Sequence, residues 1–158
     1  MSEHHQPISD SEDESKWLMQ LVGSIVGLTV AIGGIAIYAP SCIASGYIEK
    51  RDEMIPVIQQ IKKAELAYFA EHARYLAVAP YLKEPTGLAY PWKSEDAGAF
   101  NELGFQPTIE TRSSYSVVLE GDGFMVIGVS DVDGDSIEAT YVATRDKDAE
   151  LITNPKIY

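Results

Sequence analysis

Carboxylate side chains occupy alternate positions in the stretch "DVDGDSIEATYV", which contains Asp131, Asp133 and Asp135. The first three ligands of an EF-hand calcium loop have this spacing, because a hard cation binds several carboxylate oxygens that converge from a tight turn. Glu138 could supply a fourth oxygen from the same stretch. The pattern therefore indicates a candidate calcium site formed by these four residues.

Two positions of this stretch depart from the EF-hand pattern. Ser136 stands at the sixth position, where glycine allows the sharp turn, and Val142 stands at the twelfth, where a bidentate carboxylate closes the site. Asp and Gly are also common in turns between strands for conformational reasons alone. Two interpretations therefore stand side by side, a calcium site and a simple turn.

The segments around this stretch have the composition of β-strands. "SSYSVVLEG" and "GFMVIGVSD" are rich in β-branched and aromatic residues, and they are joined through Gly121, Asp122 and Gly123, which predicts a hairpin. "EATYVATRD" alternates in the same manner, and "AELITNPKIY" is a candidate for a short final strand. We therefore expect an antiparallel sheet of three to four strands over about residues 113–158.

A long helix is expected before the sheet. The stretch "GYIEKRDEMIPVIQQIKKAELAYFAEHARYL" predicts an amphipathic helix over about residues 44–78, followed by a loop rich in Pro and Gly over about 79–112. One side of the sheet is the only large surface against which such a helix can bury its apolar face, so the predicted fold class is α+β. The predicted apolar face consists of residues at steps of three or four: Ile55, Ile58, Ile61, Ala64, Tyr68, His72 and Tyr75.

Residues 17–39 contain no charged side chain, which predicts a transmembrane helix that continues into the amphipathic one. At a helical rise of about 1.5 Å per residue the segment reaches roughly 34 Å, enough for a hydrocarbon core of about 30 Å. Residues 1–16 before it are acidic and are predicted to be a disordered tail.

Glycines in the predicted span would let a second helix approach closely. The expected partners are therefore other membrane subunits or copies of the same chain, besides the lipid bilayer itself. The glycines concerned are Gly23, Gly27, Gly33 and Gly34.

Composition argues against two other classes of function. The formal net charge of −12 argues against nucleic acid as a partner, because binding to the phosphate backbone depends on Lys and Arg. The sequence also contains no recognisable pair of nucleophile and base, no phosphate-binding glycine loop and no Cys/His metal cluster. We therefore expect a protein that is not an enzyme and that has no cofactor, apart from the candidate calcium ion.

The order of these segments resembles that of the type IV pilins and pilin-like proteins, in particular the small pilins of delta-proteobacterial type. Three stretches carry the resemblance in the expected order: "AELAYFAEHARY", then "FNELGFQP" with "RSSYSVV", and then "FMVIGVSDVDGDSIEATYVATRDKDAEL". The resemblance covers most of the chain from Pro40 onward. It implies a pilin-like domain over residues 40–158, located in the periplasm and anchored in the bacterial inner membrane.

The N-terminal region departs from the prepilin pattern. When Pro40 is matched to the helix proline of the family, Met19 takes the first mature position, Leu18 replaces the cleavage glycine, and Gly23 replaces the assembly glutamate. We therefore expect no cleavage by a prepilin peptidase and a permanent single-pass anchor. The expected function is that of a structural or accessory subunit of a filament or larger membrane complex, and the alternative is a calcium-dependent binding module displayed at the membrane surface.

Overall fold

The structure is a computed structural model, and it describes residues 44–85 and 87–158. The predicted tail (1–16), the predicted span (17–39) and the four glycines within it lie outside the described residues. Among the described residues, no helix is both long enough and apolar enough to cross a membrane. The second of the two compact units of the chain is Ser45–Tyr158.

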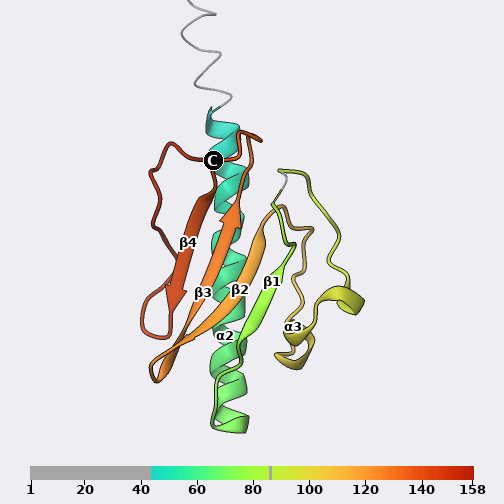
Figure 1. The fold of residues 1–158 in the computed structure, drawn as a ribbon, viewed down its shortest axis with the longest axis vertical. Coiled ribbons are helices and arrows are strands. Elements are labelled where there is room, and N and C mark those ends of the chain that lie inside the picture. Colours follow the sequence, from blue (N-terminus) through green and yellow to red (C-terminus); the bar gives the residue numbers. More distant parts are fainter. Residues whose placement is uncertain (1–43, 86) are drawn as a thin grey trace, which may run out of the picture. The chain divides into compact units, whose positions relative to one another are not determined.

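One long helical stretch packs on one face of an antiparallel sheet, which confirms the α+β class (Figure 1). Residues 44–52 are helical, Glu53 is a turn residue, and α2 then extends over Met54–His72. Pro56 falls in the first turn of α2, where a missing backbone N–H costs no intrahelical hydrogen bond. The chain can therefore remain helical on both sides of Glu53.

The helix ends at His72, six residues before the predicted end. Ala73 adopts a left-handed conformation with φ of 53°, and its N–H donates to the carbonyl of Phe69 at 2.8 Å. The chain then turns back, so that the ring of Tyr75 lies 4.5 Å from that of Phe69 and 4.8 Å from that of Phe124. Tyr75 therefore contacts the core from a loop, and the prediction that it lies on the helix was wrong.

The sheet has five strands in the order β1-β2-β3-β4-β5, and every neighbouring pair is antiparallel. The sequence predicts three to four strands over about residues 113–158, and the structure has four strands in this range. Their bounds are Ser114–Glu120 for β2, Gly123–Ser130 for β3, Ala139–Thr144 for β4 and Glu150–Leu151 for β5. The pairing of Glu120 with Gly123 confirms the predicted β2–β3 hairpin, in which Gly121 takes φ of 58°.

The fifth strand comes from the segment that was predicted to be a loop. β1 extends over Val78–Tyr81 and pairs with β2 at the edge of the sheet, with a register shift between Val78 and Tyr81. Pro80 is tolerated because an edge strand has one unpaired side. The same segment also contains a 3₁₀ helix, η1 (Ser94–Asp96), and a short helix, α3 (Ala99–Glu102). The prediction of a loop over about 79–112 therefore missed β1, η1 and α3, although most other described residues of this range belong to no helix or strand.

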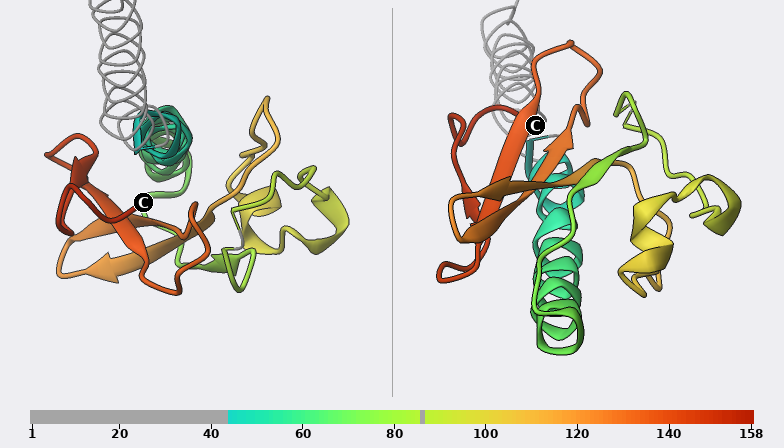
Figure 2. Two further views of the ribbon diagram at one scale, coloured as in Figure 1. Left: turned by 90° about the horizontal axis from the view of Figure 1, so that it is seen from above. Right: turned by 60° about the horizontal axis from the view of Figure 1, so that its bottom comes forward.

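The core lies between α2 and the inner face of the sheet, as the end-on view in Figure 2 shows. Ile58, Ile61 and Tyr68 are buried as predicted, whereas Ile55 is only partly buried. The buried side of α2 also contains two charged residues, Lys62 and Glu65, which the predicted apolar face did not include. The sheet contributes alternate residues of its strands to this core: Tyr115, Val117, Phe124, Val126, Ala139, Tyr141 and Ala143.

Candidate functional site

The acidic loop, residues 131–138, connects β3 to β4, whose ends are paired through Ser130 and Ala139. Two residues of the loop have positive φ: Gly134 at 76° and Ser136 at 67°. Ser136 therefore adopts the left-handed conformation for which the EF-hand pattern uses glycine at the sixth position. The sharp turn forms although the glycine is absent.

Three of the four predicted ligands come together in this loop. Asp131, Asp133 and Asp135 each offer one carboxylate oxygen, and these oxygens all lie within 4.8 Å of one another. Within residues 44–85 and 87–158, no other group of three or more His, Cys, Asp or Glu side chains could hold a metal ion. Glu138, the fourth predicted ligand, is exposed, and the structure does not bring it into this group.

Backbone N–H groups hold two of the three carboxylates in place. Asp131 is buried, and its Oδ1 and Oδ2 accept hydrogen bonds from the N–H groups of Gly134 at 2.8 Å and Ser136 at 3.1 Å. Oδ1 of Asp135 accepts from the N–H of Ile137 at 2.8 Å. Since a carboxylate oxygen has more than one lone pair, these bonds orient the oxygens and leave acceptor capacity for a cation.

The negative charges in the loop affect one another. Desolvation raises the pKa of the Asp133 carboxyl, and the negative charges of Asp135 and Asp131 raise it further. A cation bound among the three carboxylates would neutralise this repulsion. The arrangement is thus suited to binding a hard cation.

The acidic loop is supported by the last residues of the chain and by the helix start. The N–H of Val132 donates to the carbonyl of Tyr158 at 2.9 Å. Nη1 of Arg51, a residue that is only 5% exposed, donates to the carbonyls of Pro155 at 2.8 Å and Ile157 at 3.0 Å. The C-terminal residue accordingly lies beside the first described helical residues in Figure 1, and the ring of Tyr47 is 5.9 Å from that of Tyr158.

A second group of contacts fixes Arg51 itself. Its guanidinium lies over the rings of Tyr141 and Tyr158, at 5.9 Å and 5.8 Å from their centroids, and its Nε donates to Asp52 at 2.9 Å. The hydroxyl of Tyr141 donates to the same carboxylate of Asp52 at 2.7 Å. Desolvation, followed by this hydrogen bond, raises the pKa of Tyr141 to about 12, so the phenol keeps its proton and remains a donor.

Neither family models, nor curated proteins, nor solved structures give a match to this chain.

Sequence reasoning missed the buried charged residues, although one of them was detectable. Glu65 follows Ile58 by seven residues and Ile61 by four, so helical periodicity places it on the same face as those two core residues. Arg51 gave no such signal, because its partners are backbone carbonyls more than a hundred positions away. Contacts of that kind depend on the tertiary fold alone.

Proposed function

We propose that this protein is a single-pass, membrane-anchored, pilin-like structural subunit that acts through protein contacts and has no catalytic role. One observation carries the proposal: a long uncharged segment precedes, in the sequence, an amphipathic helix that packs on an antiparallel sheet. This combination supports an anchor that is continuous with the spine of the folded unit. The proposed location is the bacterial inner membrane, with the folded unit in the periplasm.

The proposed subunit keeps its anchor. Leu18, Met19 and Gly23 stand where a prepilin has its cleavage glycine, its first mature residue and its glutamate, so cleavage by a prepilin peptidase is not expected. We therefore favour an accessory subunit of a filament or larger membrane complex. Its partners would be other membrane subunits or copies of itself.

The glycines of the uncharged segment provide the first test. A Gly23→Leu/Gly27→Leu double variant should lose most of the partner that co-purifies with the wild-type chain, because leucine side chains separate helices that small residues allow to approach. The measurement is quantitative co-purification from membranes in mild detergent.

Val22→Leu/Val26→Leu is the matched control. These residues have the same spacing as the two glycines but lie on a neighbouring face of the same predicted helix. Equal loss of the partner from both double variants, or undiminished retention by the glycine variant, would refute close helix packing at Gly23 and Gly27.

The convergence of three carboxylates supports a second candidate function, a calcium-dependent binding module at the membrane surface. Calcium at about 100 times its Kd should stabilise the folded unit by about 2.7 kcal/mol, because an ion that binds only the folded state shifts the unfolding equilibrium. Thermal unfolding of the full chain with calcium and with magnesium measures this effect. An Asp133→Asn/Asp135→Asn variant should show no calcium shift.

Glu138→Gln distinguishes a proposed site of three carboxylates, Asp131, Asp133 and Asp135, from the four-residue site expected from the sequence. Because Glu138 is not a member of the carboxylate group, this variant should keep the full calcium shift. If millimolar calcium leaves the unfolding temperature of the wild-type chain unchanged, the acidic loop is a turn and not a site.

A further inference from the structure

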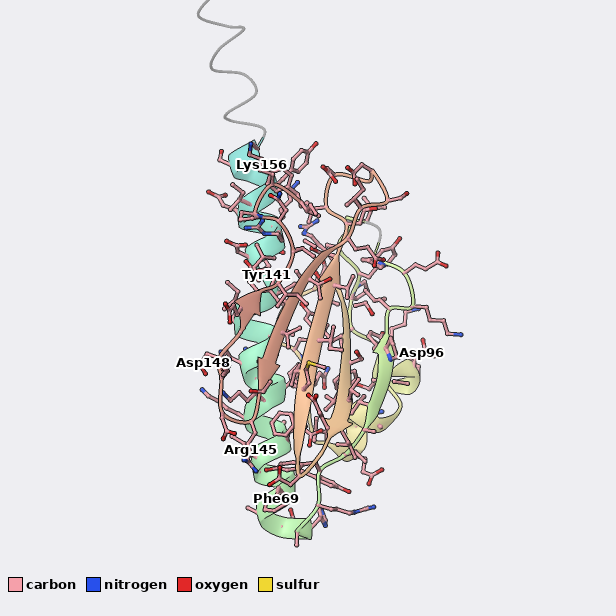
Figure 3. All side chains as sticks on the ribbon, turned by 60° about the vertical axis from the view of Figure 1, so that its left-hand side comes forward. Phe69, Asp96, Tyr141, Arg145, Asp148 and Lys156 are labelled. Atoms are coloured by element: carbon pink, nitrogen blue, oxygen red, sulfur yellow. The ribbon has the colours of Figure 1, made fainter. Side chains whose placement is uncertain are left out.

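A hollow of about 340 Å³ lies between the end of β1 and the segment that leads into η1. Its volume is within the range of small-ligand sites, roughly 300–1,000 Å³. Figure 3 labels Asp96, one of the residues that line the hollow, near the β1 edge of the sheet. Asp148 and Arg145 are labelled on the side where α2 lies. The hollow is lined by Pro80, Tyr81, Leu82, Lys83, Tyr90, Pro91, Lys93 and Asp96.

The walls of this hollow are held in place by the fold. The hydroxyl of Tyr81 accepts a hydrogen bond from the N–H of Lys93 at 2.9 Å, and its ring lies 4.1 Å from that of Trp92. Tyr90 and Thr111 exchange two backbone hydrogen bonds, at 2.8 Å and 3.0 Å. A ligand that binds in this hollow therefore has little protein to order, which lowers the cost of binding.

The backbone at one wall of the hollow is strained. Leu82 has φ of 55°, a conformation that a leucine rarely adopts. Strain of this kind persists only where the surrounding structure imposes it, and it is concentrated at ligand sites. The surrounding structure therefore holds the backbone of Leu82 fixed at this wall of the hollow.

The charges around the hollow differ from those of the rest of the chain. Two lysines, Lys83 and Lys93, line it in a protein of net charge −12. Neither ammonium forms an ion pair with any residue that the structure describes, whereas Arg112 pairs with Glu53 and Arg145 with Asp146. Two exposed ammonium groups beside apolar walls attract an anion.

Asp96 restricts the kind of anion. Its carboxylate lines the same hollow and likewise has no hydrogen-bond donor or cation among the described residues. A ligand that satisfies the whole lining must accept hydrogen bonds from two ammonium groups, donate one to a carboxylate, and present a flat apolar face to tyrosine and proline. Inorganic phosphate has no apolar face, and a simple aromatic carboxylate has no hydroxyl donor for Asp96.

We propose that the hollow formed by Tyr81, Tyr90, Lys83, Lys93 and Asp96 binds a sugar acid, such as one unit of an acidic polysaccharide. The carboxylate of the sugar accepts from the lysines, a ring hydroxyl donates to Asp96, and the C–H face of the ring packs on the tyrosines. This inference is independent of the proposed membrane anchor, because it uses only contacts within residues 80–96 and their neighbours.

The test is isothermal titration of the full-length chain, in mild detergent, with trigalacturonate. We expect saturable binding with a Kd on the order of 1 mM or tighter. A neutral galactose trisaccharide should bind at least about tenfold more weakly, since it lacks the carboxylates. 4-Hydroxybenzoate also has a carboxylate, a hydroxyl donor and a flat face, so it is the rival ligand. We expect it to bind more weakly than trigalacturonate, because it offers one carboxylate and one hydroxyl where the trisaccharide offers several of each.

Lysine variants locate the binding. Lys83→Gln/Lys93→Gln should weaken trigalacturonate binding by at least about tenfold, while the exposed pair Lys63→Gln/Lys156→Gln should leave it unchanged. Thermal unfolding of each variant shows whether the fold is retained. The proposal is overturned by absent binding, by equal binding of the neutral sugar, by tighter binding of 4-hydroxybenzoate, or by an equal effect of both lysine pairs.

Discussion

The contribution of Glu65 to the free energy of unfolding should fall by roughly 3 kcal/mol as the pH rises from 4.5 to 7, because burial raises the pKa of Glu65 from 4.5 to about 7. The Glu65 side chain is fully buried. Its Oε2 accepts one hydrogen bond, from the N–H of Leu76 at 3.1 Å, and its Oε1 has no partner among the described residues. The neutral carboxyl is therefore favoured in the folded state.

The direction of this effect follows from proton binding. Between pH 4.5 and 7 the folded chain holds a proton on Glu65 that the unfolded chain has released. The stabilisation is fully present below pH 4.5 and is lost as the pH rises through about 7. At neutral pH and above, the fold contains a buried carboxylate with a single hydrogen bond.

Glu65→Gln isolates this contribution, because glutamine keeps an oxygen for Leu76 and cannot ionise. The difference in unfolding free energy between the variant and the wild type should change by roughly 3 kcal/mol across the same pH range, in favour of the variant at high pH. Urea unfolding followed by circular dichroism measures it. Glu49→Gln, an exposed change on the preceding helical residues, is the control and should run parallel to the wild type.

A pH-independent difference between Glu65→Gln and the wild type would contradict this account. It would mean that Glu65 has the same affinity for protons in the folded and unfolded chains. The desolvation of the buried Glu65 carboxylate would then be compensated by contacts other than the hydrogen bond from Leu76.

Gly128→Ala should lower the free energy of unfolding by about 2 kcal/mol, because it overfills the contact between β3 and α2. A Cβ at Gly128 would lie 2.7 Å from Cδ1 of Ile58 and 3.3 Å from Sδ of Met54, and both of these side chains are fully buried. The missing side chain is therefore what lets the helix approach the sheet at this point. Gly123→Ala in the same strand is the control, since its Cβ would meet its nearest neighbour at an ordinary 3.7 Å.

The clashing atom can be removed by a second change. Ile58→Val deletes Cδ1 and should cost about 1 kcal/mol alone by leaving a cavity. In the Gly128→Ala/Ile58→Val double variant the methyl group added by the first change partly fills that cavity. The combined loss should therefore be smaller than the sum of the two single losses by about 1 kcal/mol or more. Strict additivity would show that Gly128 and Ile58 are not in the predicted contact.

The parts of the fold that could be predicted from sequence are those governed by local patterns. The β2–β3 hairpin follows from Gly121 and Gly123 between two β-branched runs, and the buried side of α2 follows in part from the spacing of Ile58, Ile61 and Tyr68. In both cases the interactions that decide the structure lie within a few residues of one another.

Features that depend on tertiary contacts could not be predicted in this way. The helix ends at His72 because the chain must turn back for Tyr75 and Leu76 to reach the core, and the local pattern continued to favour helix. β1 was missed because Pro80 is typical of loops, and only its position at a sheet edge makes it compatible with a strand.

The candidate sites show the same division between local and tertiary information. The alternation of Asp131, Asp133 and Asp135 was sufficient to predict that their carboxylates converge, whereas the structure does not bring Glu138 into that group. The lysine-lined hollow could not be predicted from sequence, since Lys83 and Lys93 meet only through the pairing of Tyr81 and Tyr90 with other segments.

The measurement that tests the central claim most directly is the intact mass of the native protein after gentle detergent extraction of its membrane, together with the masses of whatever migrates with it. We predict an unmethylated chain that still carries the residues before Met19 and that sits in a defined membrane complex. A chain that begins at Met19 and is found in sheared surface filaments would contradict this account and identify a processed, polymerising pilin. Recovery of the protein without any membrane extraction would contradict the anchor itself.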